Sequence, residues 1–402
     1  MTLFHNPLER RRSSFDWMNV VVYSFVFLFS LFFFYIITGR EGNDISIHSV
    51  WSANSSFDDP ISFIRHVAHP LWHVLMRIIN IFTSRIWAAT ILTATLKTVE
   101  LFVVHRFFLC TMQVSQRISL AWALVCLTVS SLCIPSYNPT VYLGVGSPNP
   151  WHSPTQLFAM LFMFVAIAYT VYLLEQFNQA VKDGNHCDTG LKKPILLGVI
   201  LFFSLLAKPT FMQAFLPACC LYFLVLWIKN PKQSQFFIRI LLCVLPSIVF
   251  MIGQYFYYFG QIIIETNTMV VDFSMGKMLT ILISSLLMSA FPLSVIILLV
   301  RKPLTTLQKV TYLFFIIATL EYMFLGEGGK RAADGNFGWG MMGASLMLWA
   351  VSLIDFVNWA KFATQKTSKE KAKLLALGLL LAWHLFSGIY YLYYYITSGN
   401  LI

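Results

Sequence analysis

Long runs of apolar residues alternate with short polar segments along almost the whole chain. The hydrocarbon core of a membrane is about 30 Å thick, so a helix that crosses it needs about 20 mostly apolar residues. The lengths of the apolar runs predict eleven membrane helices. Their expected ranges are 17 to 38, 85 to 106, 117 to 134, 155 to 175, 194 to 207, 211 to 228, 237 to 256, 278 to 300, 309 to 324, 338 to 357 and 373 to 396.

The composition agrees with this pattern. Of the 402 residues, 58% are hydrophobic and only 11% are charged. We therefore expect an all-α, polytopic membrane protein in which residues 1–402 form a single integral membrane domain, without a separate soluble domain. A net charge of +11 would indicate a nucleic-acid partner in a soluble protein. Here it follows from the membrane topology, so we expect the lipid bilayer as a partner and no nucleic acid.

Lys and Arg residues are distributed unevenly between the two sets of predicted loops. With a cytoplasmic N-terminus, 19 of the 28 fall in or beside the inner segments, 8 in or beside the outer ones, and Lys97 lies within a helix. Because cytoplasmic loops carry an excess of positive charge, we expect the N-terminus inside and the C-terminus outside. A topology with one kinked helix over 194 to 228 would place the Lys-rich segment 361 to 373 outside, and the charges disfavour it.

The first outer loop, 39 to 84, is the longest. Over Ile61 to Asn80 its apolar residues recur at spacings of three and four, which is typical of an amphipathic helix in the membrane interface. Pro70 breaks or kinks this helix, so we expect two short interfacial helices.

Several side chains of this loop are suited to chemistry. Asp44 follows the first membrane helix and precedes His48, and a carboxylate at that boundary can act as a general base or bind a divalent cation. The alternative is that Asp44 only caps a helix that begins at Ile45. His69 and His73 lie four residues apart on one helix face, where they can hold a phosphate or a metal, or extend toward lipid headgroups.

The second outer loop, 135 to 154, is rich in Pro, Asn and Gly and is predicted to form structured turns. It presents Asn149, Trp151 and His152 between prolines. An indole ring and polar side chains on a rigid loop suit a sugar, whose apolar face stacks on the ring. The alternative is that Trp151 belongs to the interfacial aromatic belt.

One lone cation and one candidate ion pair lie near or within the predicted helices. Lys208 stands at the junction of two short helices, beside Pro209, and a lone amine at membrane depth suits a phosphate oxygen, although it can also extend to the surface. Lys97 and Glu100, three residues apart within a helix, are expected to form an ion pair because pairing lowers the cost of burial.

The outer loop 325 to 337 is rich in glycine and charge. Glycines let backbone amides approach an anion, and Lys330 and Arg331 would neutralise it. The spacing is not that of a nucleotide-binding loop. The alternative is a solvated charged loop. The remaining polar residues of this segment are Glu327, Asp334 and Asn336.

Taken together, these features resemble the GT-C superfamily of integral membrane glycosyltransferases, which use polyprenyl-phosphate-linked sugars. The resemblance covers nearly the whole chain through short motifs: Asn43-Asp44 with His48, His69-Pro70-Leu71-Trp72-His73, Asn149-Pro150-Trp151-His152, Lys208-Pro209-Thr210 and Glu327 to Trp339. The chain departs from many members in lacking a soluble C-terminal domain and in showing a single Asp where an Asp-Glu pair is common.

The resemblance implies a role for each of these residues. Asp44 would be the catalytic acidic residue. It would also bind the metal ion if a divalent cation such as Mg²⁺ or Mn²⁺ takes part. Lys208, Lys330 and Arg331 would bind the donor phosphate. The residues expected to contact the acceptor or the sugar are His48, His69, His73, Asn149, Trp151, His152, Glu327, Asp334 and Asn336.

The implied reaction transfers a sugar from a polyprenyl-phosphate-linked donor to an acceptor glycan or lipid. The expected location is a bacterial inner (plasma) membrane, with the active site on its outer face. Two other classes remain open. A lipid or oligosaccharide transporter would also need outer cations and aromatic residues, but it should have an equally polar inner vestibule. A polysaccharide polymerase or ligase would depend on a large late outer loop, whereas the largest outer loop here is the first.

Overall fold

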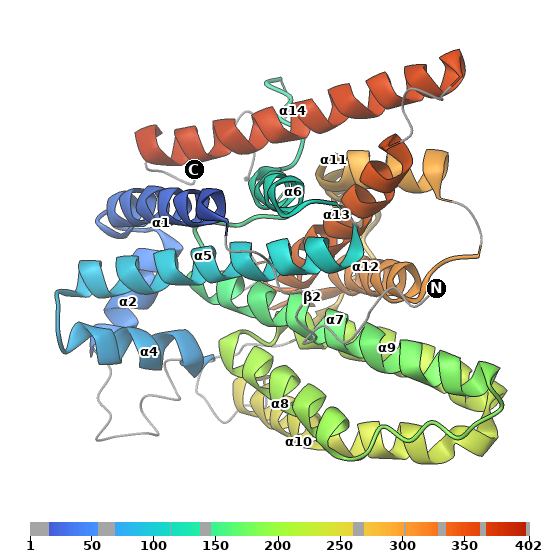
Figure 1. Cartoon of the computed structure of the whole chain (residues 1–402). Coiled ribbons are helices and arrows are strands. Elements are labelled where there is room, and N and C mark those ends of the chain that lie inside the picture. Colours follow the sequence, from blue (N-terminus) through green and yellow to red (C-terminus); the bar gives the residue numbers. More distant parts are fainter. Residues whose placement is uncertain are drawn as a thin grey trace.

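The computed structural model describes residues 16–54, 69–112, 114–136, 146–259, 269–300, 303–328, 335–361 and 367–398. The described chain is almost entirely helical (Figure 1). The longer elements are α1 (Trp17–Thr38), α5 (Arg85–Thr111), α7 (Pro154–Lys182), α9 (Thr210–Lys229), α10 (Ser234–Phe259), α11 (Met275–Leu299), α12 (Thr306–Phe324), α13 (Gly338–Ala360) and α14 (Ser368–Ser398). The shorter ones are α2 (Asp44–Asn54), α4 (Pro70–Asn80), α6 (Gln116–Thr128), α8 (Lys192–Ala207), the 3₁₀ turn η1 (Pro231–Gln233), β1 (Met269–Val271) and β2 (Leu325–Glu327).

The predicted all-α membrane fold is confirmed. Within the described residues, nine helices are long and apolar enough to cross a membrane, and each of the eleven predicted ranges contains a helix. The two that fall short of a full crossing by length are α6, with 13 residues, and α8, with 16. The protein is therefore an integral, multi-pass membrane protein.

Local sequence signals account for the starts of several helices. The side chains of Ser84 and Ser115 accept hydrogen bonds from backbone amides in the first turns of α5 and α6. Thr305 and Gln308 form a reciprocal capping box at the start of α12. Such caps satisfy amide groups that the helix itself leaves unpaired, which places these ends at definite residues.

The two helices between α1 and α5, α2 and α4, lie at one end of the bundle. In Figure 1, α2 and α4 lie at the end where α14 finishes, and Arg40 joins the two regions by donating to the carbonyls of Tyr395 (2.7 Å) and Ile396 (2.6 Å). The predicted break at Pro70 is confirmed, because Pro70 is the first residue of α4. The segment 61 to 68 of the predicted amphipathic stretch lies outside the described residues.

The shortness of α6 has a visible consequence for the chain that follows it. The non-helical segments 129–136 and 146–153 continue from its end, and most of their side chains are buried. Irregular backbone is tolerated at membrane depth where protein surrounds it. Helix α14 closes over this region through Gly388, where an added Cβ would lie 1.6 Å from the carbonyl oxygen of Thr128. Only glycine permits this approach.

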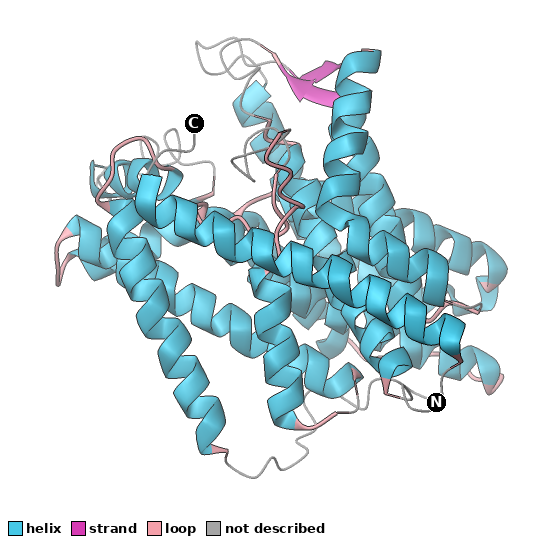
Figure 2. Ribbon diagram, turned by 90° about the horizontal axis from the view of Figure 1, so that it is seen from above, coloured by secondary structure: helices cyan, strands magenta, loops and turns pink. Residues whose placement is uncertain are grey.

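A two-stranded sheet was not expected from the sequence. Strands β1 and β2 pair antiparallel, with Met269 opposite Glu327, at the periphery of the helical bundle (Figure 2). They join the segment before α11 to the segment after α12. The sheet holds Glu327 next to the ends of the membrane helices.

Candidate functional site

Asp44 is placed by a tight turn after the first membrane helix. Gly42 adopts φ +85°, a conformation open to glycine, and the side-chain amide of Asn43 donates to the carbonyl of Ile37 (3.2 Å). Asp44 then occupies the first turn of α2, where the helix dipole favours a carboxylate. One turn later His48 places its Nε2 3.3 Å from Oδ1 of Asp44. Helix α2 thus begins at Asp44 itself, one residue before the start that the cap interpretation gave it, and the Asp44 carboxylate contacts His48.

Two further histidine contacts extend from this pair. Nδ1 of His48 lies 2.9 Å from Nε2 of His73, and Nδ1 of His73 lies 3.2 Å from the carbonyl oxygen of His69. The helices α2 and α4 thus present a continuous polar chain from a carboxylate to a histidine backbone. His48 and His73 are both buried.

These contacts determine where the protons lie. A carbonyl oxygen only accepts, so Nδ1 of His73 carries a proton. Burial lowers the pKa of His73 to about 3, so the ring is neutral and its Nε2 accepts from Nδ1 of His48. His48 is thereby committed to a proton on Nδ1. One further proton then lies between Nε2 of His48 and Oδ1 of Asp44.

The surroundings of Asp44 keep its carboxyl group ionised. Burial by itself would raise the pKa of Asp44, but its contact with His48 and the charge of Lys208 act in the opposite direction, and the pKa lies below its usual range. Asp44 is therefore a carboxylate. The second oxygen of Asp44, Oδ2, is buried and has no hydrogen-bond partner among the described residues. It is the atom left to accept a proton.

Lys208 comes to the same site from a distant part of the chain. It caps the end of α8 in an extended conformation and is 7% exposed. Its ammonium group lies 3.9 Å from the centre of the Trp339 ring, in the first turn of α13. Burial lowers the pKa of Lys208 to about 8, and the opposing charge of Asp44 keeps it from falling further. The site thus holds a desolvated cation near a carboxylate.

His152 adds a third side to the site. Its Nδ1 lies 3.0 Å from the hydroxyl of Tyr391, and its ring lies 5.6 Å from Tyr395 and 5.8 Å from Trp339 between ring centres. Burial lowers the pKa of His152 to about 4. Helix α14, through its two tyrosines, and helix α13, through Trp339, therefore hold a neutral imidazole beside Asp44 and Lys208.

A cavity of about 350 Å³ opens beside Lys208. The carboxamide of Asn336 donates to the Glu327 carboxylate at its rim (2.5 Å). The Nε2 atom of His69 is buried without a hydrogen-bond partner in the described part of the chain. Such a mixture of cation, carboxylate and amide can bind an anionic, hydroxyl-rich group. The polar residues that line the cavity are His69, Lys208, Thr210, Gln213, Gln254, Tyr255, Glu321, Glu327 and Asn336.

A second cavity of about 280 Å³, almost entirely apolar, lies next to the polar cavity along α9 and α10. Residues Thr210 and Gln213 of α9 line the polar cavity, and Met212 and Phe215 line the apolar one. On α10 the lining likewise passes from Met251 and Ile252 to Ile248 and Val244. The pair of cavities offers a polar compartment at the end of α8 and a hydrophobic one along the helices.

The structure brings together many, but not all, of the residues singled out from the sequence. Asp44, His48, His73, Lys208 and His152 meet in one place. Of these, only Lys208 lines the polar cavity. Asn149 and Trp151 are buried and line neither cavity, so a sugar contact for them stays a prediction. Lys330, Arg331 and Asp334 lie outside the described residues.

Sequence reasoning missed Glu321, Tyr391 and Tyr395. Glu321 is an isolated carboxylate near the end of the apolar run of α12, and an ionisable residue in such a run is a recognised signal of function. The two tyrosines lie in a run of several aromatic residues near the end of α14, which carries no comparable signal.

The side chains around Asp44 do not fit the predicted divalent cation. No group of three or more His, Cys, Asp or Glu side chains in the described segments could hold a metal ion. Both ring nitrogens of His48 and His73, and Oδ1 of Asp44, already contact one another or the carbonyl of His69. We therefore assign no step to a metal.

No family model matches the chain. No curated protein and no solved structure matches it either.

Proposed function

We propose that this protein is a membrane glycosyltransferase of the GT-C type. It moves a sugar from a polyprenyl-phosphate-linked donor to an acceptor glycan or lipid on the outer face of the membrane. The observation that carries the proposal is the Lys208 ammonium in the wall of a polar cavity that is followed by an apolar one, with the Asp44 carboxylate close enough to interact with it electrostatically. Transfer from a lipid-phosphate donor requires a base for the acceptor hydroxyl, a cation for the leaving phosphate and a hydrophobic compartment for the lipid tail.

The reaction follows from these positions. Oδ2 of Asp44 takes the proton from the acceptor hydroxyl as its oxygen bonds to the anomeric carbon of the sugar. The bond between that carbon and the phosphate oxygen breaks, and the oxygen leaves with the electron pair. Lys208 stabilises the negative charge on the departing polyprenyl phosphate. His48 holds Asp44 in its ionised form before the transfer.

The cavities divide the donor into two parts. The polar one accommodates the phosphate and sugar, with Glu327 and Asn336 as hydroxyl partners. The apolar one, between α8, α9 and α10, takes the first isoprene units of the tail. Burial of each CH₂ group stabilises binding by about 0.8 kcal/mol, so affinity is expected to rise with tail length.

The proposed topology has eleven crossings, with the N-terminus in the cytoplasm and the site on the outer face of a bacterial inner membrane. Both short helices support it. Arg117 at the start of α6 pairs with Asp16 before α1 (2.8 Å), whereas the carbonyls at the end of α6 accept from Asn149 before α7 (2.9 Å). Helix α6 therefore begins beside the start of α1 and ends, short of a full crossing, beside the segment that precedes α7. Helix α8 likewise ends at Lys208, on the side of Asp44.

The experiment is turnover of purified protein in nanodiscs with a panel of polyprenyl-phosphate-linked sugars, read as release of polyprenyl phosphate. Asp44→Asn should reduce turnover by about two to four orders of magnitude, because the amide keeps the shape and removes the base. Asp183→Asn is the matched control, since Asp183 is exposed and its carboxylate accepts from the Gln179 side chain at the far end of α7. Full activity of Asp44→Asn would refute the assignment.

A further inference from the structure

Two opposite charges lie in the middle of the membrane-spanning helix α5. Nζ of Lys97 is 2.8 Å from Oε2 of Glu100, and the side chains are each 1% exposed. Lys97 lies 12 residues after Arg85, roughly 18 Å along the helix. The predicted ion pair is confirmed. A buried pair at this depth is costly to desolvate, and apolar residues of similar size would often be as stable. Stability alone therefore does not account for it.

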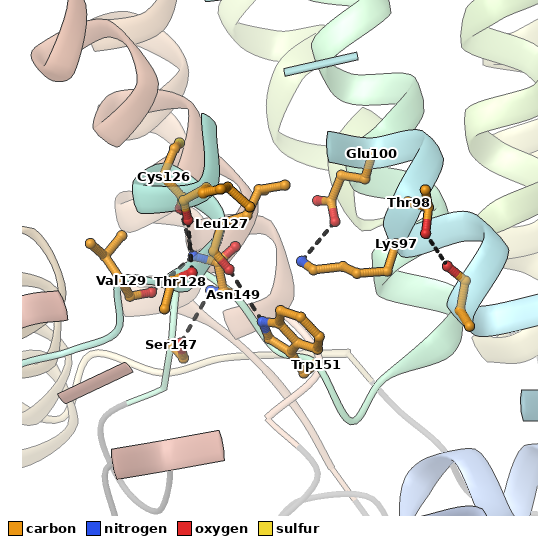
Figure 3. Close-up of polar contacts among 12 residues, drawn as sticks. Lys97, Thr98, Glu100, Cys126, Leu127, Thr128, Val129, Ser147, Asn149 and Trp151 are labelled. Atoms are coloured by element: carbon orange, nitrogen blue, oxygen red, sulfur yellow. Dashed lines mark hydrogen bonds and ion pairs between the residues drawn. The ribbon is translucent and has the colours of Figure 1, made fainter. Parts of the chain in front are cut away.

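Lys97 has a second partner from another part of the chain. Its ammonium group lies 4.4 Å from the centre of the Trp151 ring (Figure 3). The indole is also held at its edge, where Nε1 donates to the carbonyl of Leu127 (3.2 Å), and the Phe33 ring packs against it at 5.5 Å. A cation over an indole face is favourable, and more so when water is excluded. Lys97 thus helps to determine the orientation of Trp151.

The backbone around Trp151 is bound to the end of α6 at a second point. The side-chain amide of Asn149 donates to the carbonyls of Cys126 and Val129, each at 2.9 Å (Figure 3). The backbone amide of Asn149 donates to the hydroxyl of Ser147 (3.1 Å). The segment 146–153 therefore has little freedom of its own. Its position depends on α6 through Asn149 and on α5 through Trp151.

The next residue after Trp151 belongs to the candidate site. His152 contacts Tyr391 and packs near Trp339, whose ring carries the ammonium of Lys208. A shift of the Trp151 backbone would move His152, and with it the packing around Trp339. The ion pair in the membrane is thus connected to the outer site through a short series of contacts.

We propose that Lys97 and Glu100 are positioning residues of the outer site. Lys97 holds the Trp151 ring, and thereby places His152 against Trp339 and keeps Lys208 oriented toward the cavity. Glu100 neutralises Lys97 and fixes the direction of its side chain. The ligand readout below rests on the proposed function, whereas the spectroscopic readout does not.

The test replaces both charges, Lys97→Met with Glu100→Gln, so that neither is left unpaired. The indole ¹⁵N–H signal of Trp339, assigned with Trp339→Phe, should shift or broaden in nanodiscs. The affinity for undecaprenyl phosphate should fall about tenfold, the scale of a desolvated cation–π contact. The melting temperature should stay equal or rise. The single variant Lys97→Arg keeps a cation over the Trp151 ring. It should show the wild-type Trp339 signal and the wild-type affinity.

The outcomes separate the two proposals. An unchanged Trp339 signal with unchanged affinity in the double variant would overturn the positioning role. So would a melting temperature that is lowered in the double variant and normal in Lys97→Arg, with the Trp339 signal unchanged in both, because the pair would then serve stability. If wild-type protein does not bind undecaprenyl phosphate, the proposed function is wrong, and the Trp339 signal still decides the role of Lys97.

Discussion

The ammonium of Lys208 faces the Trp339 ring at 3.9 Å, and these two residues join α8 to the start of α13 at the wall of the polar cavity. The indole partly compensates the lost hydration of the cation without neutralising it. Lys208 therefore keeps its charge for an incoming anion. The Asp44 carboxylate acts on it electrostatically from the start of α2.

Binding of a lipid phosphate should depend on pH through Lys208. Burial lowers the pKa of Lys208 to about 8, so the free protein loses this charge as the pH rises through that value. The affinity for undecaprenyl phosphate should be high below pH 8 and decrease above it. Lys208→Arg should move the decrease to higher pH, because a guanidinium stays protonated. The measurement is a dissociation constant as a function of pH, with the exposed Lys232→Arg as control. An affinity that stays constant through pH 8 to 9 would contradict the prediction.

The buried histidines should make the protein sensitive to mild acid. Burial lowers the pKa of His73 to about 3 and that of His152 to about 4, below the usual 6.5. Between the lowered pKa values and 6.5, the unfolded chain binds more protons than the folded protein. The stability that depends on neutral His73 and His152 is therefore fully present above about pH 6.5 and is lost as the pH falls toward 4.

Each such histidine contributes at most about 1.4 kcal/mol per pH unit in that window. His73→Gln should reduce the slope of unfolding free energy against pH by one proton, whereas His186→Gln, at an exposed position, should not. Thermal unfolding in detergent at several pH values measures this. Equal slopes for the wild type and His73→Gln would count against neutral, buried His73.

The contact of α14 with α6 should tolerate no side chain at Gly388. An added Cβ would lie 1.6 Å from the carbonyl of Thr128, so Gly388→Ala must push the helices apart. We expect a loss of at least about 1 to 3 kcal/mol, the range for overpacking. Gly378→Ala on the same helix is the control, because nothing lies within 4 Å of its added Cβ. It should be neutral or stabilising, since alanine favours helix. Equal melting temperatures for both variants would disprove this close contact.

The orientation in the membrane can be tested by cysteine labelling in a background without the seven native cysteines. Glu41→Cys, in the exposed turn after α1, should react with an impermeant thiol reagent from outside. Lys232→Cys and Lys369→Cys, at the opposite end of the bundle, should react only after permeabilisation. The basis is the excess of Lys and Arg on the inner side. Labelling of Lys369→Cys in intact cells would reverse the topology.

The sequence by itself determined the features that depend on neighbouring residues. The lengths of the apolar runs placed the membrane helices, since a helix in lipid satisfies its backbone internally and needs no distant partner. Pro70 marked the start of α4 because proline suits the first turn of a helix. The spacing of Lys97 and Glu100 predicted their ion pair, because residues three apart share a helix face.

Only the tertiary structure decided which of the polar residues meet. Asp44 and Lys208 are far apart along the chain, and their proximity depends on how α2, α4 and α8 pack. The inward position of Trp151 likewise follows from the early end of α6, which leaves room inside the bundle for the segment 146–153. The sequence pattern of a Pro-framed Trp is the same whether the ring faces a sugar or a buried lysine. Packing between distant helices makes that choice, because each side chain goes where the neighbouring helices leave space and a partner.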